Sequence, residues 1–398
     1  MVQMKSHDKI NKLDYFLIYL LVAITGFEFF FKGVWILFFI IGPIALYRMF
    51  EKREKFTIKF LLVIMCLILW ISLQIGASMS KYSALCYIAI KFIIYYAIVV
   101  VVKKFDIVFV KVIMHICIVS IVMYALIQIE PLRKGICDIF SFIHPLGGGI
   151  DDKVNSNPGQ SLIFYYVPIK HFIRNSGPFW EPGMFSVFIN VALAFHILER
   201  DKHNIYDWTT IIFLIASATT LSTTGYITTL FILTYYYAFI VRKIKSVFCV
   251  AFLIYLVYLF LDSDFGAEKI ANSIGNQDNE SRFGAIMYHI GIISNHIWSG
   301  IGLNSQDATE VLTSPNGLTF LFVFWGVPFG ILYYICMYKS MERFSKDILG
   351  NKSLVYTIFL YLVVLLVAFS QDVTTRHFYY VLLLYSTTET KDLKLYSK

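Results

Sequence analysis

The sequence predicts an all-α, polytopic integral membrane protein with about twelve transmembrane helices and two long loops on one face. Hydrophobic residues make up 58% of the 398 residues, and charged residues only 15%. Soluble domains carry about 25% charged residues. The apolar residues also gather into runs, and a membrane-crossing helix needs about 20 such residues. A soluble fold is therefore excluded.

The apolar runs, interrupted by short charged breaks, predict that residues 1–398 form a single membrane domain. The predicted helices lie near residues 14–31, 33–50, 56–76, 83–102, 107–129, 183–198, 206–220, 226–241, 246–261, 316–338, 353–370 and 377–387. The first run follows three lysines, but no small-residue cleavage site follows it. We therefore expect a retained first helix instead of a cleaved signal peptide.

The basic residues predict the orientation of these helices. With the N-terminus inside, 23 of the 34 lysines and arginines fall in cytoplasmic segments, ten fall outside, and Lys91 lies within a helix. The positive-inside rule therefore predicts that both termini are cytoplasmic. This placement also explains the formal charge of +8 without a nucleic-acid partner. The cysteines show no CxxC spacing, so no metal site of that kind is expected.

Two predicted external loops are much longer than the other connections, and loops of this length often carry function. The first covers residues 130–182 and is rich in turn-forming residues such as those at 147–149 and 155–159. The second covers residues 262–315. It begins polar and then shows helical apolar spacing from Phe283 to Ile297, which predicts an amphipathic helix on the membrane surface.

The strongest local signal closes the first long loop, where Arg174, Gly177, Glu181, Pro182 and Gly183 occur within ten residues. A guanidinium binds phosphate through a planar fork, which suits a lipid diphosphate at the membrane surface. The glycines would let the backbone approach a bulky ligand, and an acid followed by proline fits a helix start. The alternative is a helix cap with an interfacial arginine anchored to lipid headgroups, and the spacing fits both.

A second signal lies in the second long loop, where Arg282, His289, His296, Gly300 and Gly302 follow one another. The arginine could share the charge of a phosphate with Arg174. An imidazole near its ordinary pKa could accept a proton from a sugar hydroxyl. The alternative is an amphipathic interfacial helix whose polar residues face water.

Weaker signals have structural explanations beside the functional ones. Asn316 fits an N-cap before a helix that carries Gly326 and Gly330, and a carbohydrate-binding role is the alternative. Residues 221–225 read as a tight turn. Lys91 lies deep in a predicted helix, where an ionisable side chain is a functional candidate. Nucleotide-binding loops, zinc-protease motifs and serine-hydrolase motifs do not occur.

The order of these elements resembles that of the Wzy-type O-antigen polymerases and their relatives, the O-antigen ligases. The pieces that carry the resemblance span Arg174 to Gly330, namely Arg174-x2-Gly177-x3-Glu181-Pro182-Gly183, Leu221-Ser-Thr-Thr-Gly225, Ser281-Arg282 with Gly300-x-Gly302, and Pro315-Asn316 with Gly326 and Gly330. The ligases usually carry a histidine where this chain has Pro315, which favours the polymerases.

The resemblance implies glycosyl transfer at the outer face of the bacterial inner membrane, without a cofactor, a metal or a nucleotide sugar. The donor would be a glycan chain on undecaprenyl diphosphate, and the acceptor a lipid-linked repeat unit. A chain-length regulator protein would be a partner. Arg174 and Arg282 would bind the departing diphosphate, and His296 or Glu181 would be the base. Substrate-binding residues would be Gly177, Gly183, Gly300, Gly302 and Asn316.

Other functions share the predicted helix count. An O-antigen ligase is one alternative. A flippase or transporter of lipid-linked oligosaccharides is another, but it would be expected to carry charges inside its bundle and short loops. An ion-coupled permease has less support. The few intramembrane charges and the long loops favour an external active site.

The predicted topology can be tested with reporter fusions. Fusions after Lys104, Lys245 and Lys346 should report the cytoplasm, because these lysines end or follow inward-directed segments. Fusions near Ser156 and Asn276 should report the outside. A cytoplasmic signal near Asn276 would contradict the scheme and move Arg282 to the wrong side for an external lipid diphosphate.

Overall fold

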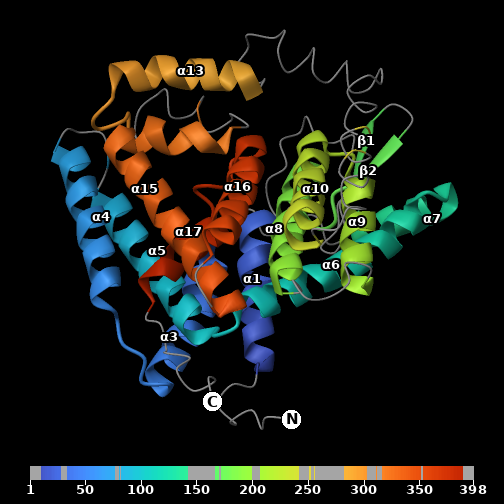
Figure 1. Cartoon of the computed structure of the whole chain (residues 1–398), viewed down its shortest axis with the longest axis horizontal. Coiled ribbons are helices and arrows are strands. Elements are labelled where there is room, and N and C mark those ends of the chain that lie inside the picture. Colours follow the sequence, from blue (N-terminus) through green and yellow to red (C-terminus); the bar gives the residue numbers. More distant parts are fainter. Residues whose placement is uncertain are drawn as a thin grey trace. The chain divides into compact units, whose positions relative to one another are not determined.

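The fold comes from a computed structural model. It describes residues 10–27, 34–76, 80, 82–141, 166–169, 172–199, 207–241, 251, 255, 282–302, 311, 316–350 and 353–388. Six of the helices in these ranges are long and apolar enough to cross a membrane. The predicted all-α membrane character is therefore confirmed (Figure 1). The count of twelve spans stays a prediction, and the predicted helix at 246–261 lies almost wholly outside the described residues.

The chain divides into two compact units. Unit 1 comprises Met1–Leu17, Trp35–Phe105 and Glu268–Lys398, and unit 2 comprises Ile18–Val34 and Asp106–Ala267. Helix α1 (Lys12–Gly26) therefore contributes to both. The other elements of unit 1 are α2 (Val34–Ile36), the π-helical segment η2 (Leu37–Ile41), α3 (Gly42–Glu51), α4 (Ile58–Gly76), α5 (Tyr82–Val101), α13 (Arg282–Asn295), α15 (Gly317–Leu349), α16 (Leu354–Ser370), α17 (His377–Leu384) and the 3-10 turn η6 (Tyr385–Thr387).

The outer face of α4 shows why these helices suit lipid. Leu69 and Leu73 are 58% and 69% exposed, and Leu61, Leu62 and Met65 are about half exposed. A soluble protein rarely presents such a continuous apolar face to water. In a bilayer the same face contacts hydrocarbon, which is as apolar as leucine.

Helix α15 is broken near its first third, although the sequence predicted one helix over 316–338. Gly326 takes φ 80° and ψ 167°, and Pro328 follows two residues later. The two parts of α15 point in different directions, and α13 lies alongside the first part (Figure 1). The break removes helical hydrogen bonds. Pro328 has no N–H to donate, and the non-helical backbone at Gly326 turns its neighbouring N–H and carbonyl groups away from their helical partners.

The carbonyl groups freed by this break bind donors from outside α15. The Val323 carbonyl accepts the Ile301 N–H at 2.8 Å. The Phe324 carbonyl accepts the Gly302 N–H at 3.2 Å and the Gln74 amide at 2.9 Å. The Trp325 carbonyl accepts the indole N–H of Trp70 at 2.9 Å, and the Val327 N–H donates to Ile297 at 2.7 Å. These bonds join α4, α15 and the turn after α13.

Two glycines permit this contact between backbones. Gly300 has φ +67°, and a Cβ there would lie 2.5 Å from the Val323 carbonyl oxygen. A Cβ at Gly326 would lie 2.3 Å from the Trp298 carbonyl oxygen. Both distances are far below van der Waals contact, so only glycine fits at the crossing.

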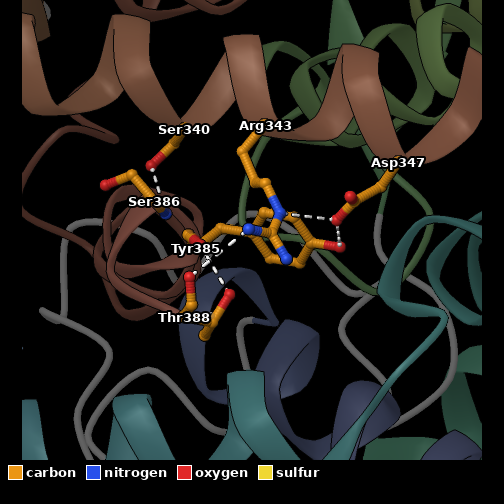
Figure 2. Close-up of polar contacts among 6 residues, drawn as sticks. All are labelled: Ser340, Arg343, Asp347, Tyr385, Ser386 and Thr388. Carbon is orange, nitrogen blue, oxygen red and sulfur yellow. Dashed lines mark hydrogen bonds and ion pairs between the residues drawn. The ribbon is translucent and has the colours of Figure 1, made fainter. Parts of the chain in front are cut away.

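The far end of α15 binds the last described turn of the chain (Figure 2). Asp347 accepts hydrogen bonds from Arg343 at 2.9 Å and from the Tyr385 hydroxyl at 3.0 Å. Ser340 donates to the Leu383 carbonyl at 2.6 Å and accepts the Ser386 N–H at 3.1 Å. The Tyr385 ring also stacks on Phe344. The contacts join the end of α17 to α15.

Unit 2 is built around a buried helix. Besides part of α1 it contains α6 (Phe105–Ile127), α7 (Glu130–Ser141), β1 (Tyr166–Ile169), β2 (Phe172–Asn175), α8 (Pro182–Glu199), α9 (Trp208–Thr220), α10 (Thr223–Tyr235) and the π-helical segment η5 (Tyr236–Val241). Side chains from Pro182 to Leu198 in α8 are all buried, and α9 and α10 pack against it. Strands β1 and β2 form an antiparallel hairpin in which Val167 pairs with Arg174. The sequence predicted neither α7 nor this hairpin.

The glycine crossing in unit 1 can be tested by adding a single methyl group. Gly300→Ala should destabilise the protein by roughly 2–5 kcal/mol, because the residue must keep a left-handed φ and its Cβ meets backbone atoms. The measurement is the melting temperature of purified protein in detergent. Gly291→Ala in α13 is the matched control, since a Cβ there meets nothing within 4 Å. Equal melting temperatures for the two variants would contradict the crossing.

Candidate functional site

In unit 2, Arg174 lies near the end of β2 and contacts the C-terminus of α9. Its Nε donates to the Thr220 carbonyl at 3.1 Å. The carbonyl end of a helix carries a partial negative charge, which favours a cation. The contact fixes the position of the guanidinium plane through one of its five N–H donors.

Asn175, the next residue, fixes the backbone beside Arg174. Its Oδ1 accepts from the Ser120 hydroxyl at 2.6 Å and from the Gly177 N–H at 2.8 Å. Its Nδ2 donates to the Thr219 hydroxyl at 2.9 Å. The side chain is fully buried and connects β2 with α6 and α9. Sequence reasoning missed this residue, although a polar Ser120 inside the apolar α6 was a usable signal.

A cluster of phenylalanine rings packs against the segment that follows Asn175. The ring of Phe179 stacks on Phe185 and Phe188 at 5.2 and 4.9 Å and meets Phe27 edge-on at 5.1 Å. Gly177 has φ +54°, and a Cβ there would lie 3.2 Å from the Phe185 ring. The backbone conformation and this packing account for the glycine, which is buried.

Two further predicted residues of this motif lie at the start of α8. The Glu181 carbonyl accepts the Phe185 N–H at 3.2 Å, which is the first helical bond of α8, and Pro182 follows as its first residue. The sequence predicted this helix start. Gly183 is buried in the first turn, and its carbonyl accepts the Ser186 hydroxyl at 2.7 Å. Arg174, Gly177, Glu181 and Gly183 therefore all belong to unit 2.

Buried polar side chains connect α8, α9 and α10 next to this turn. The Asn190 amide donates to the Gly225 carbonyl at 3.3 Å and accepts the Thr229 hydroxyl at 2.8 Å. Thr229 also shares a hydrogen bond with Ser217 at 2.9 Å. A Cβ at Gly225 would lie 2.8 Å from that of Ser186, so the helices approach closely. The predicted turn at 221–225 therefore packs directly against α8.

The remaining predicted site residues belong to unit 1. Arg282 is the first residue of α13. His296 lies just after α13 and is exposed. Gly300 and Gly302 have positive φ and bind the broken part of α15 through the contacts described above. These contacts give both glycines a structural role, and their predicted role in substrate binding stays a prediction.

Asn316 caps α15 as the sequence predicted. Its Oδ1 accepts from the backbone N–H of Leu318 at 2.9 Å and of Thr319 at 3.4 Å. The Thr319 hydroxyl shares a hydrogen bond with Nδ1 of His289 from α13 at 2.6 Å. His289 is fully buried, and burial lowers its pKa to about 4. Its imidazole is therefore neutral near pH 7.

A charged cluster that sequence reasoning missed lies between α16 and α17. Arg376 donates to the Asp372 carboxylate from Nη2 and to its carbonyl from Nε, both at 3.0 Å. Burial raises the pKa of Asp372, and Arg376 opposes that rise. Next to it, His377 Nδ1 shares a hydrogen bond with the Tyr95 hydroxyl at 2.5 Å. Lys91 lies one turn from Tyr95 on α5.

Basic side chains therefore lie in both units: Arg174 beside the end of α9 in unit 2, and Lys91 and Arg376 in unit 1. Among the residues in the described ranges, no group of three or more His, Cys, Asp and Glu side chains could hold a metal ion. No family model matches this chain, and no curated protein matches it.

The buried His289 predicts how stability depends on pH. Its folded pKa of about 4 lies below the ordinary 6.5, so the unfolded chain takes up the proton first as the pH falls. The free energy of unfolding should therefore decrease by up to about 1.4 kcal/mol per pH unit between these values. His289→Gln can keep a hydrogen bond to Thr319 but cannot titrate. Its melting temperature should decrease less than that of the wild type between pH 6.5 and 4.5.

The control for this measurement is His296→Gln, since His296 is exposed. Its melting temperature should follow that of the wild type over the same pH range. An equal decrease for wild type and His289→Gln would show that His289 does not cause the acid sensitivity.

Proposed function

We propose that this protein is a surface-polysaccharide polymerase of the Wzy type in the bacterial inner membrane. It would transfer a glycan chain from undecaprenyl diphosphate to a lipid-linked repeat unit at the outer face. The observation that carries the proposal is the position of Arg174. Its side chain binds the end of α9, and the backbone beside it is held by the buried Asn175 and by the phenylalanine cluster.

The reaction needs cations where the diphosphate leaves. As the bond between the anomeric carbon and the phosphate oxygen breaks, negative charge develops on the departing diphosphate. A guanidinium stays ionised at any working pH and binds phosphate oxygens in pairs. A cation held at a fixed place stabilises that charge without reorganising during the reaction. The contacts around Arg174 supply such a fixed cation.

Two further features support the proposal. The described part of the chain has six helices suited to a membrane, as an enzyme of lipid-linked substrates requires. Residues of the motif that resembles the polymerases also lie close together in the chain, because Gly177 and Glu181 are four positions apart between β2 and α8. The predicted partners, including a chain-length regulator, and the roles of Arg282 and His296 belong to the same proposal.

The test is the polysaccharide ladder of a deletion strain complemented with wild type, Arg174→Lys or Arg174→Ala. Lysine keeps the charge and can still donate to Thr220, but it loses the planar fork. Each lost charge-assisted hydrogen bond weakens binding by about 1.5–3 kcal/mol, so turnover should slow at least tenfold. Both variants should leave mostly single-repeat lipopolysaccharide.

Arg133→Lys in α7 is the matched control, because it makes the same exchange in the same predicted loop. It should give a full ladder, and membrane levels of all variants are measured alongside. A full ladder from Arg174→Lys at wild-type protein level would limit Arg174 to capping α9. Complete loss of polysaccharide from the deletion strain, instead of a single repeat, would favour a ligase or a flippase.

A further inference from the structure

A cavity of about 990 Å³ lies in unit 1 beside the last turns of α3. This volume is at the upper end of the usual range of ligand sites, about 300–1,000 Å³. Three segments that are far apart in the chain line the cavity: the start of α1, the C-terminal half of α3 with the residues that follow it, and Lys103 after the end of α5. The positive-inside rule predicts that all three lie at the cytoplasmic side.

The wall of the cavity changes from apolar to charged along α3. Pro43 and Tyr47 line its first part, and Arg48 and Glu51 line it nearer the end of the helix. Residues four apart share one helix face, and eight residues cover roughly 12 Å of helix. The segment Val34–Glu51 is long and apolar enough to cross a membrane. The apolar wall therefore lies within this segment, and the charged wall lies at its end.

Hydrogen bonds hold two of the cations in this wall. Arg48 is 4% exposed, and its Nη1 donates to Asp14 at 2.6 Å. Among the described residues its side chain makes no other hydrogen bond, although a guanidinium has five N–H donors. The Lys52 Nζ donates to the Val101 carbonyl at 3.1 Å, two residues before Lys103. Cations from α3 and from the end of α5 therefore lie around the same space.

A third cation stands where the backbone favours glycine. Arg53 has φ +53°. Its N–H donates to the Phe50 carbonyl at 2.9 Å, and the Glu54 N–H donates to the Met49 carbonyl at 3.0 Å. These two bonds end α3 in a left-handed turn, where glycine is the usual residue because a side chain is strained there. The helix end therefore does not explain the arginine, whose side chain lines the cavity and makes no hydrogen bond or ion pair among the described residues.

We propose that this cavity binds the headgroup of an anionic phospholipid of the cytoplasmic leaflet, with its phosphate between Lys52, Arg53 and Lys103. The acyl chains would lie along the apolar part of α3. Basic pockets beside membrane helices on the cytoplasmic side recognise such headgroups. A free anion would leave the apolar wall uncovered, and a neutral lipid would leave the cations without a partner.

The charges in the wall favour a particular headgroup. Four cations and two carboxylates, those of Glu51 and Glu54, occur among the described lining residues, so positive charge predominates. Carboxylates are hydrogen-bond acceptors, and the glycerol headgroup of phosphatidylglycerol has hydroxyls that donate. Phosphatidylethanolamine instead carries an ammonium that cancels the charge of its phosphate. Phosphatidylglycerol therefore fits both signs of charge in the wall.

The test measures dissociation constants for single lipids by native mass spectrometry of the full-length protein in detergent. Dioleoylphosphatidylglycerol is the probe. The phosphatidylethanolamine and phosphatidylcholine with the same chains, and glycerol 3-phosphate without chains, are the comparison ligands. The wild type should bind the probe about fivefold more tightly than each of them, because a cation at the membrane surface contributes about that factor toward an anionic lipid.

Two substitutions remove cations from the wall. Arg53→Gly and Lys103→Met should each raise the dissociation constant of the probe about fivefold. Lys104→Met is the matched control, because it removes the same charge one residue further on, and Lys104 is not among the described residues that line the cavity. It should bind like wild type. Arg53→Gly should melt at or above the wild-type temperature, since glycine relieves the left-handed strain, so its loss of binding would not come from unfolding.

Several results would overturn the proposal. Equal affinity for the three lipids would show an apolar contact without headgroup recognition, and equal affinity for glycerol 3-phosphate would show a site for a free anion. Wild-type affinity in both Arg53→Gly and Lys103→Met would remove the cations from the site. An equal loss in Lys104→Met would show general attraction to a basic surface. Tighter binding of a hexaglutamate peptide than of the probe would assign the cavity to an acidic protein segment.

Discussion

Backbone groups inside a membrane must be hydrogen-bonded within the protein, and this constraint organises unit 1. The break of α15 at Gly326 frees carbonyl groups that hydrocarbon cannot hydrate, and each free group would cost several kcal/mol. Donors from α4 and from the turn after α13 bind them at 2.8–3.2 Å. The positions of these elements thus depend on the same few hydrogen bonds. Substitutions at the crossing should affect the whole unit and not one loop.

Unit 2 meets the same constraint with side chains. Asn175 and Asn190 are fully buried; Asn175 makes hydrogen bonds to α6 and α9, and Asn190 makes two to α10. A buried amide without partners would cost about 1–3 kcal/mol, so these networks favour one arrangement of the helices. Arg174 lies in β2, directly before Asn175. Its position is therefore a result of helix packing and not of a flexible loop.

The sequence predicted the helices well because long apolar runs have few alternatives. It did not predict the break of α15, since Gly326 and Pro328 lie in a run that is apolar throughout. The hairpin of β1 and β2 was missed because its strands are only four residues long. The predicted site residues of the first motif lie between β2 and the start of α8, and their roles stay predictions. The charges at Asp372 and Arg376 were overlooked, since a six-residue connection between two helices reads as a simple turn.

The two cations singled out in the two units differ in what surrounds them. Arg174 contacts the carbonyl end of α9, so a helix dipole already favours its charge and its plane is held. This suits a group that must be positioned for a directed contact. The Lys91 ammonium lies over the Tyr87 ring and makes no hydrogen bond or ion pair among the described residues, and an ammonium is a point charge on a flexible stem. Such a cation tolerates rotation of its ligand. The surroundings of Arg174 therefore hold its guanidinium in place, whereas the position of the Lys91 ammonium depends on its own flexible stem.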